Sequence, residues 1–267
     1  MTTRIQHLSC ASMHPLAGRV GLVPRDWVAH CLLVETGDRV VLVDTGFGTA
    51  DVREGRSRIG HVAPALIGFD LRREDTALAQ LPGRGVDPAA VTDVVLTHLD
   101  LDHAGGLGDF PQARVHVHRR ELEAARHPRL DERMRYVPAQ WAHGPRWVEH
   151  DEPGEDFFGL GGASVVADDV LLVPLHGHSR GHSAVAVRRP GDEGWLLHAG
   201  DAYFFHGDKA TPRTCPPALR AFQRVLAADD RRRVDNLARL QTLHAEHGDE
   251  VRVFSAHDQQ EYDALRG

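Results

Sequence analysis

The sequence predicts one α/β domain, built from short apolar strands that alternate with helices along the chain. Runs rich in Val and Leu recur and end in Gly, Asp or His, which is typical of buried strands that lead into loops. No Pro- or Ser-rich linker divides the 267 residues, and one domain of this length can bury a full core. The hydrophobic fraction of 42% and the charged fraction of 26% are those of an ordinary globular protein.

The first half of the chain consists mainly of predicted strands. Residues 27–35 and 39–43 form two β-rich runs, and Thr36-Gly37-Asp38 between them is a hairpin turn signal. Further strands are expected at residues 91–97 and 114–118, helices at 75–81 and 121–126, and a flexible Gly- and Arg-rich stretch at 52–60.

The second half combines further strands with two longer helices. Strands are expected at residues 170–175, 184–188, 194–198 and 251–255, and helices at 217–228 and 231–247. Val234, Leu237, Leu240 and Leu243 recur at helical spacing and predict a core-facing stripe on the last helix. Residues 127–162 carry Trp141, Trp147 and several prolines, so we expect an irregular insertion or lid within a single domain of residues 1–267.

Charge and cysteine content limit the classes of partner. The formal net charge of −7 provides no basic footprint for nucleic acid. No apolar run is long enough to span a membrane or to act as a secretory signal. The three cysteines, Cys10, Cys31 and Cys215, lack metal-ligand spacing and are expected to be buried thiols. We therefore expect a cytoplasmic protein with a small-molecule substrate, with a homodimer left open as its assembly.

Four of the predicted strands lead into loops that begin with His or Asp. The residues in question are His98, Asp100, Asp102, His103, His178, Asp201 and His257. Loops at strand ends can present ligands to one point in space, and imidazole nitrogens and carboxylate oxygens suit zinc and similar divalent ions. Seven groups exceed the needs of one tetrahedral ion, but they fit two ions that share a carboxylate and hold a bridging hydroxide.

These residues give the chain a resemblance to the metallo-β-lactamase fold superfamily. The diagnostic His-x-His-x-Asp-His motif of that family stands here as His98-Leu-Asp100-Leu-Asp102-His103, followed by Ala-Gly-Gly. The turn at Asp44-Thr-Gly, the segment Gly177-His178-Ser-Arg-Gly-His182, Gly200-Asp201 and His257 match the other family motifs in order. The resemblance covers almost the whole chain and implies an αββα four-layer sandwich, with two β-sheets flanked by helices.

The resemblance also implies a role for each residue. His98, Asp100 and His178 would hold one metal ion, Asp102, His103 and His257 would hold the second, and Asp201 would bridge them. Asp102 would also orient the attacking hydroxide. His182 and Asp44 are expected to support the ligands without binding metal themselves.

Asp100 departs from the family pattern, which usually has His at this position. One interpretation is that the first metal ion has been lost. The other is that a carboxylate replaces the imidazole and moves the preference towards harder ions such as manganese or iron. Three carboxylates and a hydroxide balance two divalent cations, so we expect two divalent ions, zinc first, with manganese or iron as alternatives.

Several residues near the motifs have less certain roles. In the lactonase branch of the family, a tyrosine three residues beyond the bridging Asp polarises the substrate carbonyl. Here that position is Phe204, and Tyr203 is one residue early, on the opposite face if the segment is extended. Tyr203 is kept as a candidate catalytic group, and Trp141 and Trp147 as pocket or packing residues. His116, His118 and His198 are expected to be structural, and His176 to face solvent.

The predicted function is hydrolysis of a small ester, lactone or thioester, in which a hydroxide bridging two metal ions attacks the carbonyl. A di-iron enzyme that reacts with oxygen is the first alternative, because related flavin-containing reductases carry a carboxylate at the position of Asp100. We expect no flavin domain here. Hydrolysis of a phosphodiester is the second alternative, although no basic exosite for a nucleic acid is visible.

Overall fold

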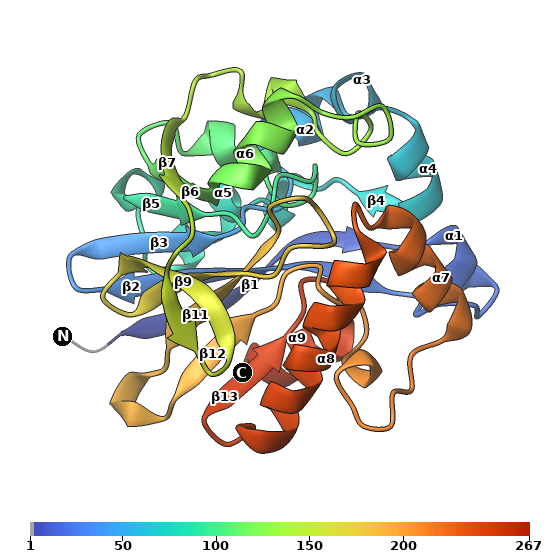
Figure 1. The fold of residues 1–267 in the computed structure, drawn as a ribbon. Helices are drawn as coiled ribbons and strands as arrows, with labels where there is room; N and C mark the ends of the chain where they lie inside the picture. Colours follow the sequence, from blue (N-terminus) through green and yellow to red (C-terminus); the bar gives the residue numbers. More distant parts are fainter. Residues whose placement is uncertain (1–2) are drawn as a thin grey trace.

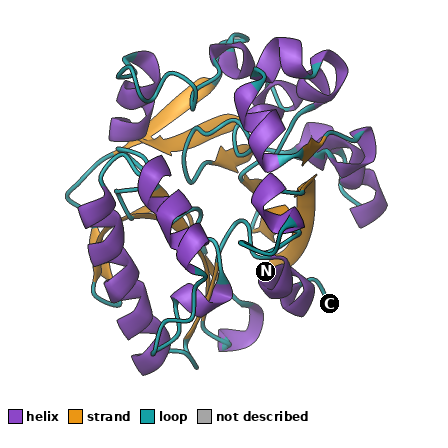
Figure 2. Ribbon diagram, turned by 90° about the vertical axis from the view of Figure 1, so that its right-hand side faces the viewer, coloured by secondary structure: helices purple, strands orange, loops and turns teal. Residues whose placement is uncertain are grey.

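The computed structural model describes residues 3–267 and confirms the predicted architecture of two β-sheets flanked by helices (Figure 1). A seven-stranded sheet and a six-stranded sheet pack face to face. Figure 1 shows α2, α5 and α6 beside the first sheet and α8 beside the second, and the view turned by 90° shows helices on the outside of the strands (Figure 2). The layers are therefore those of an αββα sandwich.

The first sheet has the strand order β4-β1-β2-β3-β5-β6-β7. Its strands are β1 (Arg4–Met13), β2 (Trp27–Thr36), β3 (Arg39–Val43), β4 (Phe69–Asp70), β5 (Asp93–Val95), β6 (Arg114–His118) and β7 (Arg146–His150). From β3 to β7 the pairs are parallel, and Val43 lies opposite Val95. Asp44 and the His98–His103 loop therefore leave the same edge of this sheet.

The second sheet has the order β13-β12-β11-β10-β9-β8. Its strands are β8 (Glu155–Phe157), β9 (Leu160–Ala167), β10 (Val170–Pro174), β11 (Ser183–Arg188), β12 (Trp195–His198) and β13 (Val251–Phe254). Strands β12 and β13 run parallel, with His198 opposite Phe254. The loops that carry Asp201 and His257 therefore start side by side.

Nine α-helices are described in residues 3–267. They are α1 (Leu16–Arg19), α2 (Thr49–Glu54), α3 (Arg56–Ile59), α4 (Val62–Ile67), α5 (Ala77–Gln80), α6 (Arg119–Arg126), α7 (Pro217–Leu226), α8 (Asp230–Glu246) and α9 (Gln259–Leu265). The side chain of Asp229 caps α8 by accepting the backbone N–H of Arg232, and Asp258 caps α9 in the same way. Within this part of the chain, no helix has both the length and the apolar composition of a membrane span.

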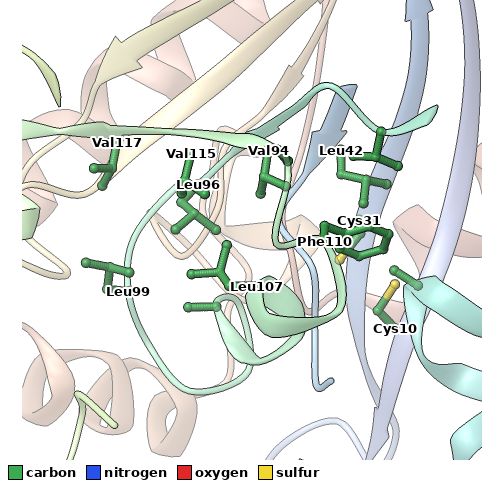
Figure 3. Packing of buried hydrophobic residues seen from close by; sticks show 14 of the residues in the cluster. Cys10, Cys31, Leu42, Val94, Leu96, Leu99, Leu107, Phe110, Val115 and Val117 are labelled. Carbon is green, nitrogen blue, oxygen red and sulfur yellow. The ribbon is translucent and has the colours of Figure 1, made fainter. Parts of the chain in front are cut away.

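Apolar layers between the sheets and under the helices hold the sandwich together. The middle layer joins the facing sheets through Val43, Val95 and Leu172, among others. A second layer packs the outer face of the first sheet against helices, and Figure 3 shows Phe110 beside Leu42, Cys10 and Cys31 in it. The three cysteines are buried and unpaired, as expected.

The structure corrects several local expectations. Residues 127–162 are not one irregular insertion, because β7, β8 and the start of β9 lie in that range and extend the two sheets. Residues 52–60 form parts of α2 and α3 instead of a flexible stretch. Strand β1 and helix α9 were not predicted, since β1 depends on pairing with β2 rather than on its own polar-rich sequence.

The predicted stripe on α8 is confirmed at three of its four positions. Leu237, Leu240 and Leu243 are buried against the second sheet, whereas Val234 is 42% exposed. We expect Leu240→Ala to lower the free energy of unfolding by roughly 2–5 kcal/mol, because it removes a fully buried side chain and leaves a cavity. Val234→Ala is the matched control on the same helix and should change stability by less than about 1 kcal/mol. Urea denaturation measures both, and equal losses would contradict this packing.

Candidate metal centre

All seven predicted ligands meet at one edge of the sandwich. His98, Asp100, Asp102 and His103 follow β5, His178 follows β10, Asp201 follows β12 and His257 follows β13. Their nitrogen and oxygen atoms form two adjoining clusters. The first cluster is His98, Asp100 and His178, the second is Asp102, His103 and His257, and Asp201 lies between them.

The carboxylate of Asp201 lies between the two clusters, and its Oδ2 is also 3.2 Å from Nε2 of His257 in the second cluster. Its Oδ2 lies 3.4 Å from Nε2 of His178 and 3.7 Å from Nε2 of His98. Its Oδ1 lies 3.0 Å from Nε2 of His257 and 3.3 Å from Nε2 of His103. This is the position that a bridging ligand would need.

Unpartnered buried atoms lie where the two clusters meet. Among the residues described, Nε2 of His98, Nε2 of His103 and Oδ1 of Asp201 are buried without a hydrogen-bond partner. Such atoms are rare in folded proteins and costly to leave unsatisfied. Two of the three belong to the second cluster or face it, and imidazole with carboxylate is a zinc-type donor set. The donor atoms there suit a divalent ion.

Asp44 fixes the orientation of His103. Its Oδ2 accepts the Nδ1–H of His103 at 2.8 Å, and the carboxylate also accepts the backbone N–H and the hydroxyl of Thr97, each at 2.8 Å. Nε2 of His103 therefore points towards Asp201. Burial alone would raise the pKa of Asp44, but His103 lowers it below its ordinary value. Burial would likewise lower the pKa of His103, but Asp201 and Asp44 raise it well above its usual range.

His182 has no nitrogen left for a metal ion. Its Nδ1 donates to the carbonyl of Leu175 at 2.9 Å, and its Nε2 accepts the backbone N–H of Asp201 at 2.9 Å. This imidazole therefore holds the loop of Asp201, which is the supporting role expected for it.

Glu121 on α6 is a supporting residue that the sequence did not reveal. Its buried carboxylate accepts the backbone N–H of Leu99 at 3.0 Å and that of Gly181 at 3.0 Å. It also accepts the hydroxyls of Ser179 and Tyr136. Glu121 is one of several charged residues in a predicted helix, so the sequence gives no signal that it ties the two histidine loops together.

Arg135 places a positive charge in the first cluster, and it too was missed. Its Nη1 lies 2.7 and 3.0 Å from the two oxygens of Asp100 and 2.8 Å from Nε2 of His178. A guanidinium only donates, so Nε2 of His178 is the acceptor. Burial and Arg135 lower the pKa of His178 to about 4, and Arg135 with His98 outweighs burial to hold the pKa of Asp100 well below its usual value. The first cluster therefore already contains a permanent positive charge, the guanidinium of Arg135.

The structure places Tyr203 away from the clusters. Its hydroxyl donates to the carboxylate of Glu261 at 3.1 Å, inside the apolar layer of the second sheet. The expectation of a catalytic Tyr203 is corrected accordingly, because the hydroxyl is fully buried and bonded elsewhere. Phe204 takes the opposite face, and its ring lies 5.0 Å from that of His257. Trp141 and Trp147 pack against the layer beneath the first sheet.

A third group of metal-type side chains lies outside the two clusters. His118, Glu152 and His176 come together, and His176 is buried rather than exposed to solvent as expected. However, Nδ1 of His118 accepts the backbone N–H of Arg120, so its Nε2 carries the proton in the neutral ring. A metal ion would need that nitrogen deprotonated, which makes this group a poor metal site.

The chain belongs to the metallo-beta-lactamase superfamily, whose family model matches residues 24–246. It is 39% identical to a probable metallo-hydrolase of Mycobacterium tuberculosis over 98% of this chain and 83% of that protein. It is 34% identical to an N-acyl homoserine lactonase of Azorhizobium caulinodans, over 50% of this chain and 49% of that protein.

A solved structure has the same fold. It is an N-acyl homoserine lactone hydrolase with the product N-hexanoyl-L-homoserine at its catalytic metal centre, with a TM-score of 0.76 and 22% identity over 100% of this chain and 98% of the other. The predicted superfamily and enzyme class are thus confirmed, and the chain is a metal-dependent hydrolase.

The contact between Asp44 and His103 predicts a loss of metal affinity on substitution. Asp44→Asn weakens the acceptor that orients His103, and we expect metal affinity to fall roughly 10–100-fold. Competition with a chromophoric chelator measures this affinity. Asp38→Asn, in an exposed turn, is the control and should leave it unchanged. Equal affinities for wild type and Asp44→Asn would show that Asp44 does not position a ligand.

Proposed function

We propose that this enzyme hydrolyses a lactone, or a small carboxylic ester or thioester of similar shape. The observation that carries the proposal is the carboxylate of Asp201, set between two clusters of buried imidazoles and carboxylates with three unpartnered atoms. The relatives named as lactonases support the same substrate class.

The residues of the second cluster have distinct tasks in this proposal. A divalent ion bound there would polarise the carbonyl and lower the pKa of a water molecule. Asp102 has a side chain that is 13% exposed, whereas those of His103 and His257 are almost fully buried. Asp102 is therefore the group that can both orient the attacking water and accept its proton. His103 and His257 stay fixed by Asp44 and by the carbonyl of Val28.

A cluster of aromatic rings packs against two of the histidines. The rings of Trp27, Phe204 and Phe222 pack on one another, and Trp27 stacks on His257 with ring centroids 6.1 Å apart. Phe204 also lies 5.9 Å from the ring of His178. Because Phe204 has no hydroxyl, charge on the substrate carbonyl must be balanced by other groups.

Zinc is our first choice of metal, since two imidazoles and carboxylates are its usual donors. The carboxylate content keeps manganese and iron as alternatives. Asp201 could bridge two ions, as the sequence predicted, but Arg135 lies in the first cluster, so the number of ions depends on that residue. The buried thiols agree with the expected cytoplasmic location.

The proposal is tested by turnover of purified enzyme prepared without chelator. We expect hydrolysis of N-hexanoyl homoserine lactone or p-nitrophenyl acetate, its loss after dialysis against chelator, and its return with zinc or manganese. Bis-p-nitrophenyl phosphate serves as the phosphodiester comparison.

His103→Ala should lower kcat/KM by about 100-fold or more, because it removes a ligand held by Asp44 and faced by Asp201. His247→Ala, at the residue that follows the C-terminal end of α8, is the control. Undiminished turnover in chelator, or turnover of the phosphodiester alone, would refute the proposal.

A further inference from the structure

We propose that Arg135 takes the place of a first metal ion, so that the enzyme works with one metal ion, held by Asp102, His103, His257 and Asp201. The guanidinium supplies the fixed positive charge in the cluster of His98, Asp100 and His178. This inference rests on the proposed metal-dependent hydrolysis, because it concerns the same site.

The contacts of Arg135 use the atoms of two of the three side chains that a first ion would need, whereas Nε2 of His98 has no hydrogen-bond partner. Its Nη1 is 2.8 Å from Nε2 of His178 and within 3.0 Å of both oxygens of Asp100. Nε2 of His178 has one lone pair, and a hydrogen bond from Arg135 occupies it. A metal ion and this guanidinium therefore compete for His178 and Asp100.

Arg135 is held firmly rather than reaching in from solvent. Its side chain is 10% exposed, and its Nη2 donates to the carbonyl of Leu226 at the end of α7. The next residue, Tyr136, is buried and donates to Glu121, the carboxylate that ties the two histidine loops. The backbone around Arg135 is thus fixed to the same framework that positions the histidines.

The pair explains why Asp stands at position 100. Carboxylate and guanidinium form a charge-assisted pair, and a His at this position would give Arg135 no negative partner. With water rather than hydroxide at the metal, the three negative charges of Asp100, Asp102 and Asp201 are balanced by one guanidinium and one divalent ion. A second divalent ion would add two positive charges directly beside Arg135.

Metal stoichiometry tests the inference. Apo-enzyme titrated with Zn²⁺, with bound metal measured by mass spectrometry after gel filtration, should hold one ion per chain. The double variant Arg135→Ala/Asp100→His removes the guanidinium and restores an imidazole, and it should hold two ions. Arg133→Ala, exposed on the same segment, is the matched control and should hold one ion with unchanged turnover.

A second measurement keeps the test decisive if the double variant is poorly folded. Arg135→Lys retains the charge and should keep one ion per chain, whereas Arg135→Ala should bind additional zinc and lose at least about 10-fold in kcat/KM; circular dichroism checks the fold of each. Two ions in the wild type, or equal stoichiometry and kcat/KM in wild type and Arg135→Ala, would overturn the inference. Two ions with chelator-sensitive turnover would leave the proposed function standing, whereas turnover without any metal would refute the proposed function itself.

Discussion

The burial of Asp201 among four imidazoles is the constraint on which the rest of the site depends. A buried carboxylate is tolerable only where positive charge and hydrogen-bond donors surround it. In the structure, Nε2 of His257 lies within hydrogen-bond distance of the carboxylate at 3.2 Å, the rings of His98, His178 and His103 lie 3.3–3.7 Å away, and His182 accepts the backbone N–H of Asp201. The proposed metal ion would supply the remaining positive charge. Each of those rings must then be held in turn, which is why Asp44, the carbonyl of Val28 and the carbonyl of Leu175 are also part of the site.

The two sheets make this convergence possible. Parallel pairing of β3 with β5 brings Asp44 beside the histidine motif, and parallel pairing of β12 with β13 brings Asp201 beside His257. Glu121 then joins the loop after β5 to the loop after β10, so loops from both sheets share one carboxylate. Loops that are anchored to rigid strands in this way can hold ligands in a fixed geometry.

Much of the fold and of the candidate site could be predicted because the signals are local. Strands such as β3 and β10 are apolar runs that end in Asp or His, and each delivers its polar residue to the same edge. Glu121 and Arg135 could not be found in this way. Their roles depend on contacts across 22 or more positions, such as that of Glu121 with Leu99 and that of Arg135 with Asp100, and no local pattern marks them. Strand β1 was missed for the same reason, since its partner β2 determines its conformation.

The contact with Arg135 gives Asp100 a different role from the two that the sequence suggests. From the motif alone, Asp100 marks either the loss of the first metal ion or a ligand that favours harder ions. The sequence leaves both interpretations open. Paired with a guanidinium that also bonds to His178, Asp100 becomes one half of a salt bridge built into the cluster. The first cluster then keeps its positive charge, which the guanidinium of Arg135 supplies in place of a bound metal ion. A guanidinium, unlike a metal ion, cannot bind and activate a water molecule. The metal ion of the second cluster would therefore have to activate water alone. Asp102, the partly exposed carboxylate, lies beside that position.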